Sequence, residues 1–260
     1  MANKSEVKLI GKWSSPYVTR VKIALNIKSL DYENFEENET FNPKSDLLLQ
    51  SNPVYGKVPV LIHLDKPICE SLIILEYIDE TWSTALSILP TDPYDRVLAR
   101  FWAAYIDQKW FPCMQSIITV EVEEERKPYF EVMEEVVERM EDAFEKCSKG
   151  KPFFGGDRIG YLDVAFGSFL GWLSVIENEY ERKVLVEEKS PNLVKWAERF
   201  IADPAVVGLI PETERLVKLS KALQIKWRAA LELQASVMVR NPSSVIDWSE
   251  FVSAFTPNVP

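Results

Sequence analysis

The segment 57-KVPVLIHLDKPICESLIILEYIDETW-82 decides the fold, because it reads as two strands followed by one apolar helix. Residues 58–63 carry the β-branched and apolar side chains that favour a strand, and a second short strand runs to Cys69. An acid and a hydroxyl, Glu70 and Ser71, open the helix. Two polar residues in this place either cap the helix or form part of a binding site.

The chain upstream of this segment alternates between the same two patterns. It predicts a strand at 7–10, a helix with one buried face at 16–28, a strand at 31–35 and a short helix at 44–50. Together with the quoted segment, these elements define a small α/β domain over residues 1–83.

The strand patterns end downstream of this domain. Residues 84–93 are rich in breakers and are interpreted as a linker between two domains. Residues 94–224 are expected to form an all-helical second domain, and residues 225–260 are a C-terminal extension whose structure the pattern does not settle. Helical periodicity runs from 94 to 126, breaks at Pro128, resumes to Cys147 and returns at 161–178, 191–202 and 211–223.

The composition excludes several classes of protein. A formal net charge of −10 leaves no basic surplus for nucleic acid or anionic lipid. No segment resembles a signal peptide or a membrane span, so we expect a cytoplasmic protein with no membrane partner. The three cysteines and the single histidine, His63, lack metal-binding spacing, so we expect no metal site.

The stretch 155-GGDRIGYLDVAFGSFL-170 is interpreted as structural. Gly160 stands three residues before Asp163, whose carboxylate can accept hydrogen bonds from the free amides of a first helical turn. Ile159 and Val164 are placed to pack across that turn as a hydrophobic staple. The motif predicts the start of a core helix in the second domain.

The stretch 13-WSSPY-17 allows two interpretations. In the structural one, Ser15 is an N-cap and Pro16 is the first residue of the helix, an arrangement favoured on geometry alone. In the functional one, the Ser15 hydroxyl faces a cleft at the positive end of the helix and donates to an anion.

Further signals come from the ends of the predicted strands. Pro59 is either an ordinary edge proline or follows a cis bond, which would leave the backbone of Val58 free to pair with an extended peptide. Glu70 suits an ammonium group and Ser71 a carboxylate, although both could simply begin a helix. Lys44, with Lys57 near it, would attract a second carboxylate, although a lone lysine is usually a solvated surface residue. Together these signals describe a peptide with an amino-acid end, an extended middle and a terminal carboxylate.

The residues around these positions resemble one known family. The stretches 13-WSSPY-17, 44-KSDLLLQSNPVYGKVPVLIH-63 and 66-KPICESLIILEYIDETW-82 look like the soluble glutathione transferases, and most of all the plant tau class. The stretches 101-FWAAYID-107 and 153-FFGGDRIGYLDVAFGSFLGW-172 extend the resemblance, which covers roughly residues 7–224.

The resemblance implies a thioredoxin-like domain that binds glutathione, followed by an all-helical domain, in a protein usually found as a homodimer. It implies that Ser15 is the catalytic serine, and that Lys44, Val58, Glu70 and Ser71 are further contacts to glutathione. Glutathione would be a co-substrate, with no cofactor, and the other substrates would be small hydrophobic electrophiles. The residues implied to line the electrophile pocket are Tyr17, Tyr105, Trp110, Trp172, Leu219 and Leu223, each of which could instead be a core residue.

Three functions remain open from the sequence. The first is conjugation of glutathione to electrophiles, as in detoxification, which the serine at position 15 favours. The second is a carrier of hydrophobic compounds, and the third is a peroxidase acting on organic hydroperoxides through the same thiolate. The sequence also departs from the tau pattern in the longer loop 37-ENETFNPKSD-46, which makes Lys44 the least secure contact.

Overall fold

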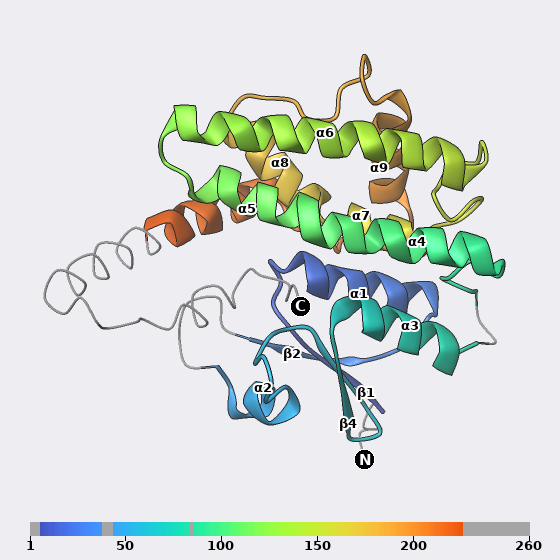
Figure 1. Ribbon diagram of the computed structural model, residues 1–260. Coiled ribbons are helices and arrows are strands. Elements are labelled where there is room, and N and C mark those ends of the chain that lie inside the picture. The colour runs from blue at the N-terminus through green and yellow to red at the C-terminus, as the bar shows by residue number, and fades with distance from the viewer. Residues whose placement is uncertain (1–5, 38–43, 84–85, 226–260) are drawn as a thin grey trace, which may run out of the picture.

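The computed structural model describes residues 6–37, 44–83 and 86–225. Figure 1 shows a sheet at one end of the molecule and a group of helices at the other, with α1 and α3 lying between them. The predicted strand at 66–69 and helix at 70–82 are both present, as β4 and α3.

The sheet has four strands in the order β2-β1-β3-β4, so that β1, the first strand of the chain, lies in the interior of the sheet beside β3. The pair β1 and β2 is parallel, whereas β1 with β3 and β3 with β4 are antiparallel. The strands are β1 (Val7–Gly11), β2 (Glu33–Glu36), β3 (Val60–His63) and β4 (Lys66–Cys69).

Both faces of the sheet are covered. Side chains alternate between the faces along each strand, so each face presents apolar residues that pack against helices. On one face Leu9 and Leu61 join the main core with α1 (Pro16–Ile27) and α3 (Ser71–Thr81). On the other face Ile10 and neighbouring strand residues pack with Leu48 of α2 (Asp46–Ser51). The main core continues into the helical part, so that the two parts share one apolar interior.

The helical part differs from the sequence prediction in several places. The helix predicted over 161–178 is divided into α7 (Tyr161–Gly167) and α8 (Leu170–Glu179). The predicted helix over 94–126 is interrupted by a π-helical turn, η1, and it ends before residue 120. The described helices are α4 (Pro93–Tyr105), η1 (Ile106–Trp110), α5 (Phe111–Thr119), α6 (Glu123–Ser148), α7 (Tyr161–Gly167), α8 (Leu170–Glu179), α9 (Pro191–Ala202) and a last helix at 213–225.

The predicted break at Pro128 is wrong, because Pro128 lies inside α6. A proline removes one backbone donor, and this cost is small against the eight buried side chains along the 26 residues of α6. The chain breaks instead between α5 and α6, where the Arg126 guanidinium donates to the carbonyl oxygens of Ile117 and Glu121, each at 3.1 Å. A side chain beyond the break thus satisfies carbonyl groups near the end of α5.

The predicted role of Asp163 at the start of a core helix is confirmed, but its donors are not the amides of the first helical turn. Its buried carboxylate accepts hydrogen bonds from the amides of Phe154, Gly155 and Gly160 and from the indole of Trp196, at 2.8–2.9 Å. Burial raises the pKa of this carboxyl group to about 6, although the four donors oppose the rise. Asp163 therefore joins the loop before α7 to α9.

Replacing this carboxylate tests its role in stability. We expect Asp163→Ala to lower the free energy of unfolding by about 3 kcal/mol or more, because it leaves four buried donors unpaired. Chemical denaturation followed by far-UV circular dichroism measures the change. Asp157→Ala is the matched control, because the Asp157 carboxylate is exposed and, among the described residues, pairs only with the exposed Lys151. Equal stability of the two variants would contradict the assignment.

Candidate active site

Ser15 caps α1, as the structural interpretation predicts. Its Oγ accepts a hydrogen bond from the Val18 amide at 3.4 Å, and Pro16 is the first helical residue. A hydroxyl that accepts through oxygen can still donate its proton. The cap and a role toward an anion are therefore compatible in one side chain.

The peptide bond between Val58 and Pro59 is cis, which is one of the two alternatives that the sequence left open. Val58 is half-buried and directly precedes Pro59 and β3. The carbonyl of the preceding residue, Lys57, accepts a hydrogen bond from Asn52 Nδ2 at 3.0 Å, which ties this turn to the end of α2.

Glu70 and Ser71 form the start of α3, but neither acts as a simple cap. Glu70 has a φ of +69° and makes no capping hydrogen bond with its side chain. Its surroundings partly desolvate the carboxylate and raise its pKa, an effect that Lys57 opposes and Asp107 reinforces. Ser71 is buried, and its Oγ accepts a hydrogen bond from Arg20 Nη1 at 3.2 Å. An exposed acid and a buried hydroxyl thus stand side by side.

Lys57 lies near this acid, and Lys44 lies near Lys57. Partial burial lowers the pKa of Lys57, which Glu70 raises and Lys44 lowers again. The Lys44 ammonium also lies over Gly56, because a Cβ on that glycine would be 3.3 Å from Nζ. The longer loop before Lys44 therefore still brings its side chain next to Gly56 and Lys57.

The largest interaction near the site is one that the sequence analysis missed. Arg20 is fully buried and forms a bidentate ion pair with Asp107, with N–O distances of 2.6 and 3.0 Å. Its Nε and Nη2 also donate to the Ala165 carbonyl at 3.1 and 2.8 Å. One guanidinium from α1 therefore binds Ser71 of α3, Asp107 of η1 and Ala165 of α7.

A signal for Arg20 was present in the sequence, since a cation on the apolar face of a helix needs a buried partner. No local pattern identified Asp107, because it contacts Arg20 only after the chain has folded. The π-helical turn that carries Asp107 is likewise not encoded by apolar spacing.

The aromatic residues predicted for an electrophile pocket occupy different environments. Tyr17 packs edge-on against Phe111 and Phe169, with ring centroids 5.3 and 5.6 Å away. Its buried hydroxyl has no hydrogen-bond partner among the described residues. Burial raises the pKa of Tyr17 well above 10, and the nearby Asp107 adds to the rise. Tyr105 is half-buried beside Trp102, at a centroid distance of 5.5 Å.

The remaining predicted pocket residues also differ from one another. Trp110 is only 1% exposed and packs edge-on against Phe166, in the interior of the helical part. Trp172 is 7% exposed, and its Nε1 donates to the Ser14 carbonyl at 2.8 Å. Leu219 and Leu223 are half-buried on the helix at 213–225. The structure brings Trp172 to the loop of Ser15, whereas Trp110 lies in the core.

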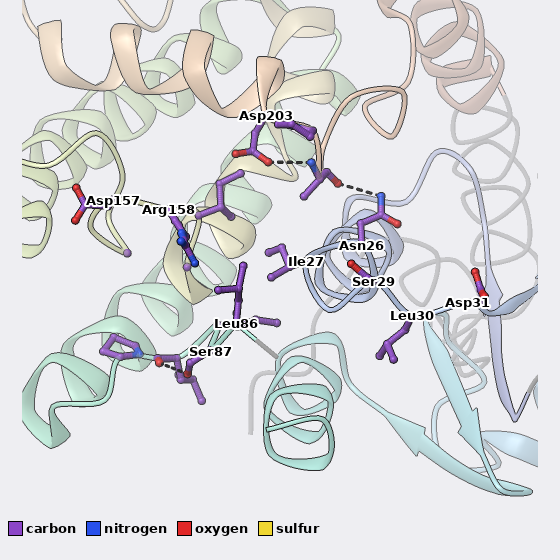
Figure 2. A pocket seen from close by; sticks show the side chains of 18 residues that line it. Asn26, Ile27, Ser29, Leu30, Asp31, Leu86, Ser87, Asp157, Arg158 and Asp203 are labelled. Atoms are coloured by element: carbon purple, nitrogen blue, oxygen red, sulfur yellow. Dashed lines mark hydrogen bonds between the residues drawn. The ribbon is translucent and has the colours of Figure 1, made fainter. Parts of the chain in front are cut away.

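A separate hollow of about 1040 Å³ lies at the opposite end of α1 (Figure 2). It is lined by the last residues of α1, the segment before α4 and the loops around Arg158 and Asp203. Because α1 has 12 residues at about 1.5 Å each, roughly 18 Å separate its two ends. The hollow is therefore distinct from the site around Ser15.

In the described part of the chain, no helix combines the length and apolar character needed to cross a membrane. Among the same residues, no cluster of three or more histidine, cysteine, aspartate or glutamate side chains has a geometry that could hold a metal ion.

Comparisons with known proteins agree with this geometry. Residues 5–80 match the family model of the glutathione S-transferase N-terminal domain, and residues 101–204 match that of the C-terminal domain. Glutathione S-transferases U18 and U17 of Arabidopsis thaliana are 55% and 56% identical, over 86% of this chain and 98% and 99% of their own lengths.

Solved structures give the same result. A tau-class glutathione S-transferase from mango has a TM-score of 0.80 and 59% identity, over 83% of this chain and 97% of that one. Rice GST1 in complex with glutathione has a TM-score of 0.78 and 34% identity, over 85% of this chain and 99% of that one.

The chain belongs to the glutathione S-transferases, with the thioredoxin-like and all-helical architecture of that family. Within the family it is a tau-class enzyme, as the plant relatives and the mango structure indicate. It conjugates glutathione, and the names of the relatives favour this activity over the carrier alternative.

Removing the buried guanidinium tests whether Arg20 organises the site. We expect Arg20→Met to lower the free energy of unfolding by about 3–5 kcal/mol, because it leaves the Asp107 carboxylate without its partner. We also expect a higher KM for glutathione, since Ser71 loses the donor that fixes its hydroxyl. Arg139→Met is the control, because Arg139 makes a comparable pair with Glu135 at an exposed position on α6. A stable Arg20→Met variant with unchanged KM would disprove this role.

Proposed function

We propose that the Ser15 hydroxyl donates a hydrogen bond to the sulfur of bound glutathione and keeps it ionised near neutral pH. The thiolate is the nucleophile, and a free thiol has a pKa of about 8.5. Lowering that pKa by about two units requires roughly 2.7 kcal/mol of selective stabilisation. One hydrogen bond to a charged group contributes about 1.5–3 kcal/mol, and the start of α1 adds to it.

The observation that carries this proposal is the position of Ser15 at the start of α1. Its Oγ already accepts from the Val18 amide, which leaves its proton for an acceptor outside the helix. None of the three cysteines stands at this position, where a cysteine would instead favour mixed-disulfide chemistry. Stabilising the thiolate by this amount requires neither a metal ion nor a histidine.

The same proposal assigns the ends of glutathione to the charges around Ser15. Glu70 holds the α-amino group of the γ-glutamyl end, and Ser71 holds its carboxylate at the start of α3. The backbone of Val58 pairs with the extended middle of the peptide. Lys44 faces the glycyl carboxylate, and its position beside Gly56 and Lys57 supports this assignment.

The second substrate is proposed to be a small hydrophobic electrophile, which makes detoxification in the cytoplasm the expected role. Its pocket would be formed by Tyr17, Tyr105, Trp172, Leu219 and Leu223, with Trp110 behind them. Aromatic walls bind flat apolar compounds through area and stacking, so we expect a broad range of substrates. The half-buried state of Tyr105, Leu219 and Leu223 supports their part in this pocket.

The enzyme is further proposed to act as a homodimer. Tyr94, Val97 and Phe101 recur at helical spacing on α4 and are each 57–69% exposed. Large apolar side chains grouped on one exposed helix face are typical of a protein interface. A second copy of the chain would cover this face in a two-fold arrangement.

The decisive test of the catalytic proposal compares the wild type with Ser15→Ala. Conjugation to an activated aryl halide should fall about tenfold or more, which corresponds to about 1.4 kcal/mol or more of lost transition-state stabilisation. The absorbance of the bound thiolate against pH should show a higher thiol pKa. Ser45→Ala is the control, because Ser45 caps α2 in the same domain by the same kind of bond. An unchanged thiol pKa in Ser15→Ala would remove Ser15 from the mechanism.

The proposed dimer is tested by placing a charge on the exposed face of α4. We expect Phe101→Glu to give a monomer, because a buried unpaired carboxylate opposes association. Light scattering after size-exclusion chromatography should give Phe101→Glu half the molar mass of the wild type. Val207→Glu, a change at a 62% exposed apolar residue after α9, should leave the mass unchanged. A dimeric Phe101→Glu variant would place the interface elsewhere.

A further inference from the structure

The loop that joins β1 to α1 carries Ser15, and side chains from distant segments of the chain contact this loop. The Trp13 amide donates to Glu36 Oε1, at the end of β2, at 2.5 Å. The Arg215 guanidinium lies over the Trp13 ring, with its central carbon 3.6 Å from the ring centroid. Within the loop, the Ser15 amide donates to the Lys12 carbonyl at 3.1 Å.

Trp172 is a further side chain from a distant segment, and it contacts the residue directly before Ser15. Its Nε1 donates to the Ser14 carbonyl at 2.8 Å, across 158 positions of sequence. The indole lies on α8 and is 7% exposed, so it presents little surface to a ligand. Without this bond, the mostly buried indole N–H would lose its partner, which makes the bond costly to break.

The Ser14 carbonyl belongs to the same peptide plane as the Ser15 nitrogen. Because that plane is rigid, its orientation fixes the N–Cα bond of Ser15, and together with the Ser15 φ of −79° it sets the direction in which the side chain leaves the backbone. A misplacement of about 1 Å in a catalytic group can reduce the rate about 100-fold. A donor that fixes the Ser14 carbonyl therefore acts on the hydroxyl of the next residue.

We propose that Trp172 is a positioning residue that orients the Ser15 hydroxyl toward the sulfur by holding the Ser14 carbonyl through its indole N–H. This inference rests on the proposed role of Ser15. It changes the role expected for Trp172 from a wall of the electrophile pocket to a support of the thiolate. The helical part of the chain thereby sets the geometry of a group carried by the thioredoxin-like part.

The test uses Trp172→Phe in the full-length enzyme, because phenylalanine keeps an aromatic ring and removes only the donor and part of the indole. We expect the thiol pKa of bound glutathione to rise by about 0.5–1 unit, and kcat near pH 6.5 to fall about 3- to 10-fold. Rates should approach those of the wild type at high pH, where the thiol ionises without help. The KM for the aryl halide should change less than about twofold.

A double-mutant cycle separates action through Ser15 from a general disturbance. If Trp172 acts through the hydroxyl, Trp172→Phe should cause no further rise in thiol pKa in a Ser15→Ala background. Trp82→Phe is the matched control, because Trp82 is half-buried beside His63 at the far end of α3. It should leave the thiol pKa and the pH profile unchanged.

Two results would overturn the inference. In the first, the thiol pKa stays constant in Trp172→Phe while the KM for the electrophile rises, as expected for a pocket wall. In the second, the effects of Trp172→Phe and Ser15→Ala on thiol pKa are additive. Should Trp172→Phe not fold, benzothienylalanine at position 172 keeps the size of the indole and replaces its N–H with sulfur, and the same shift is expected. If Ser15→Ala itself leaves the thiol pKa unchanged, the proposed function fails, which is a separate outcome.

Discussion

The buried ion pair between Arg20 and Asp107 is the constraint on which the arrangement of the two parts depends. Removing two charges from water is costly, and the cost is offset only when the geometry is good and further hydrogen bonds are made. Arg20 meets this condition with two bonds to Asp107, two to Ala165 and one to Ser71. A shift of α1 against η1 would separate the ion pair, and a shift against α7 would break the two bonds to the Ala165 carbonyl, so the relative position of these elements is fixed.

The Arg20 ion pair also affects the site, because Arg20 is close in sequence to Ser15 and binds a direct neighbour of Glu70. Arg20 lies one and a half turns after Ser15 on α1, and it binds the hydroxyl of the residue that follows Glu70. The Ser15 loop is in turn held by Trp172 and Arg215 from the helical part. A site whose polar groups belong to the first domain therefore takes much of its geometry from the second.

The sequence predicted most of the fold because the information was local. β-Branched and apolar side chains predicted β3, and helical spacing predicted α1, α3 and α9 within a few residues of their observed ends. The prediction failed at Pro128, where a long apolar face outweighs one missing donor, and at η1, where a π-helical turn keeps the apolar spacing but alters the hydrogen bonding. Propensity is a weak guide where tertiary packing decides.

The sequence by itself determined that Ser15, Glu70 and Ser71 stand at helix starts, since caps, prolines and turn signals act over a few residues. It also determined that Asp163 marks the start of a helix, where its carboxylate accepts from the amide of Gly160, three residues before it. Only the tertiary structure decided that Arg20 pairs with Asp107, that Trp172 supports Ser14 and that Trp110 lies in the core. These contacts join residues far apart in the chain, and their partners are selected by how helices pack against one another, which no local pattern encodes.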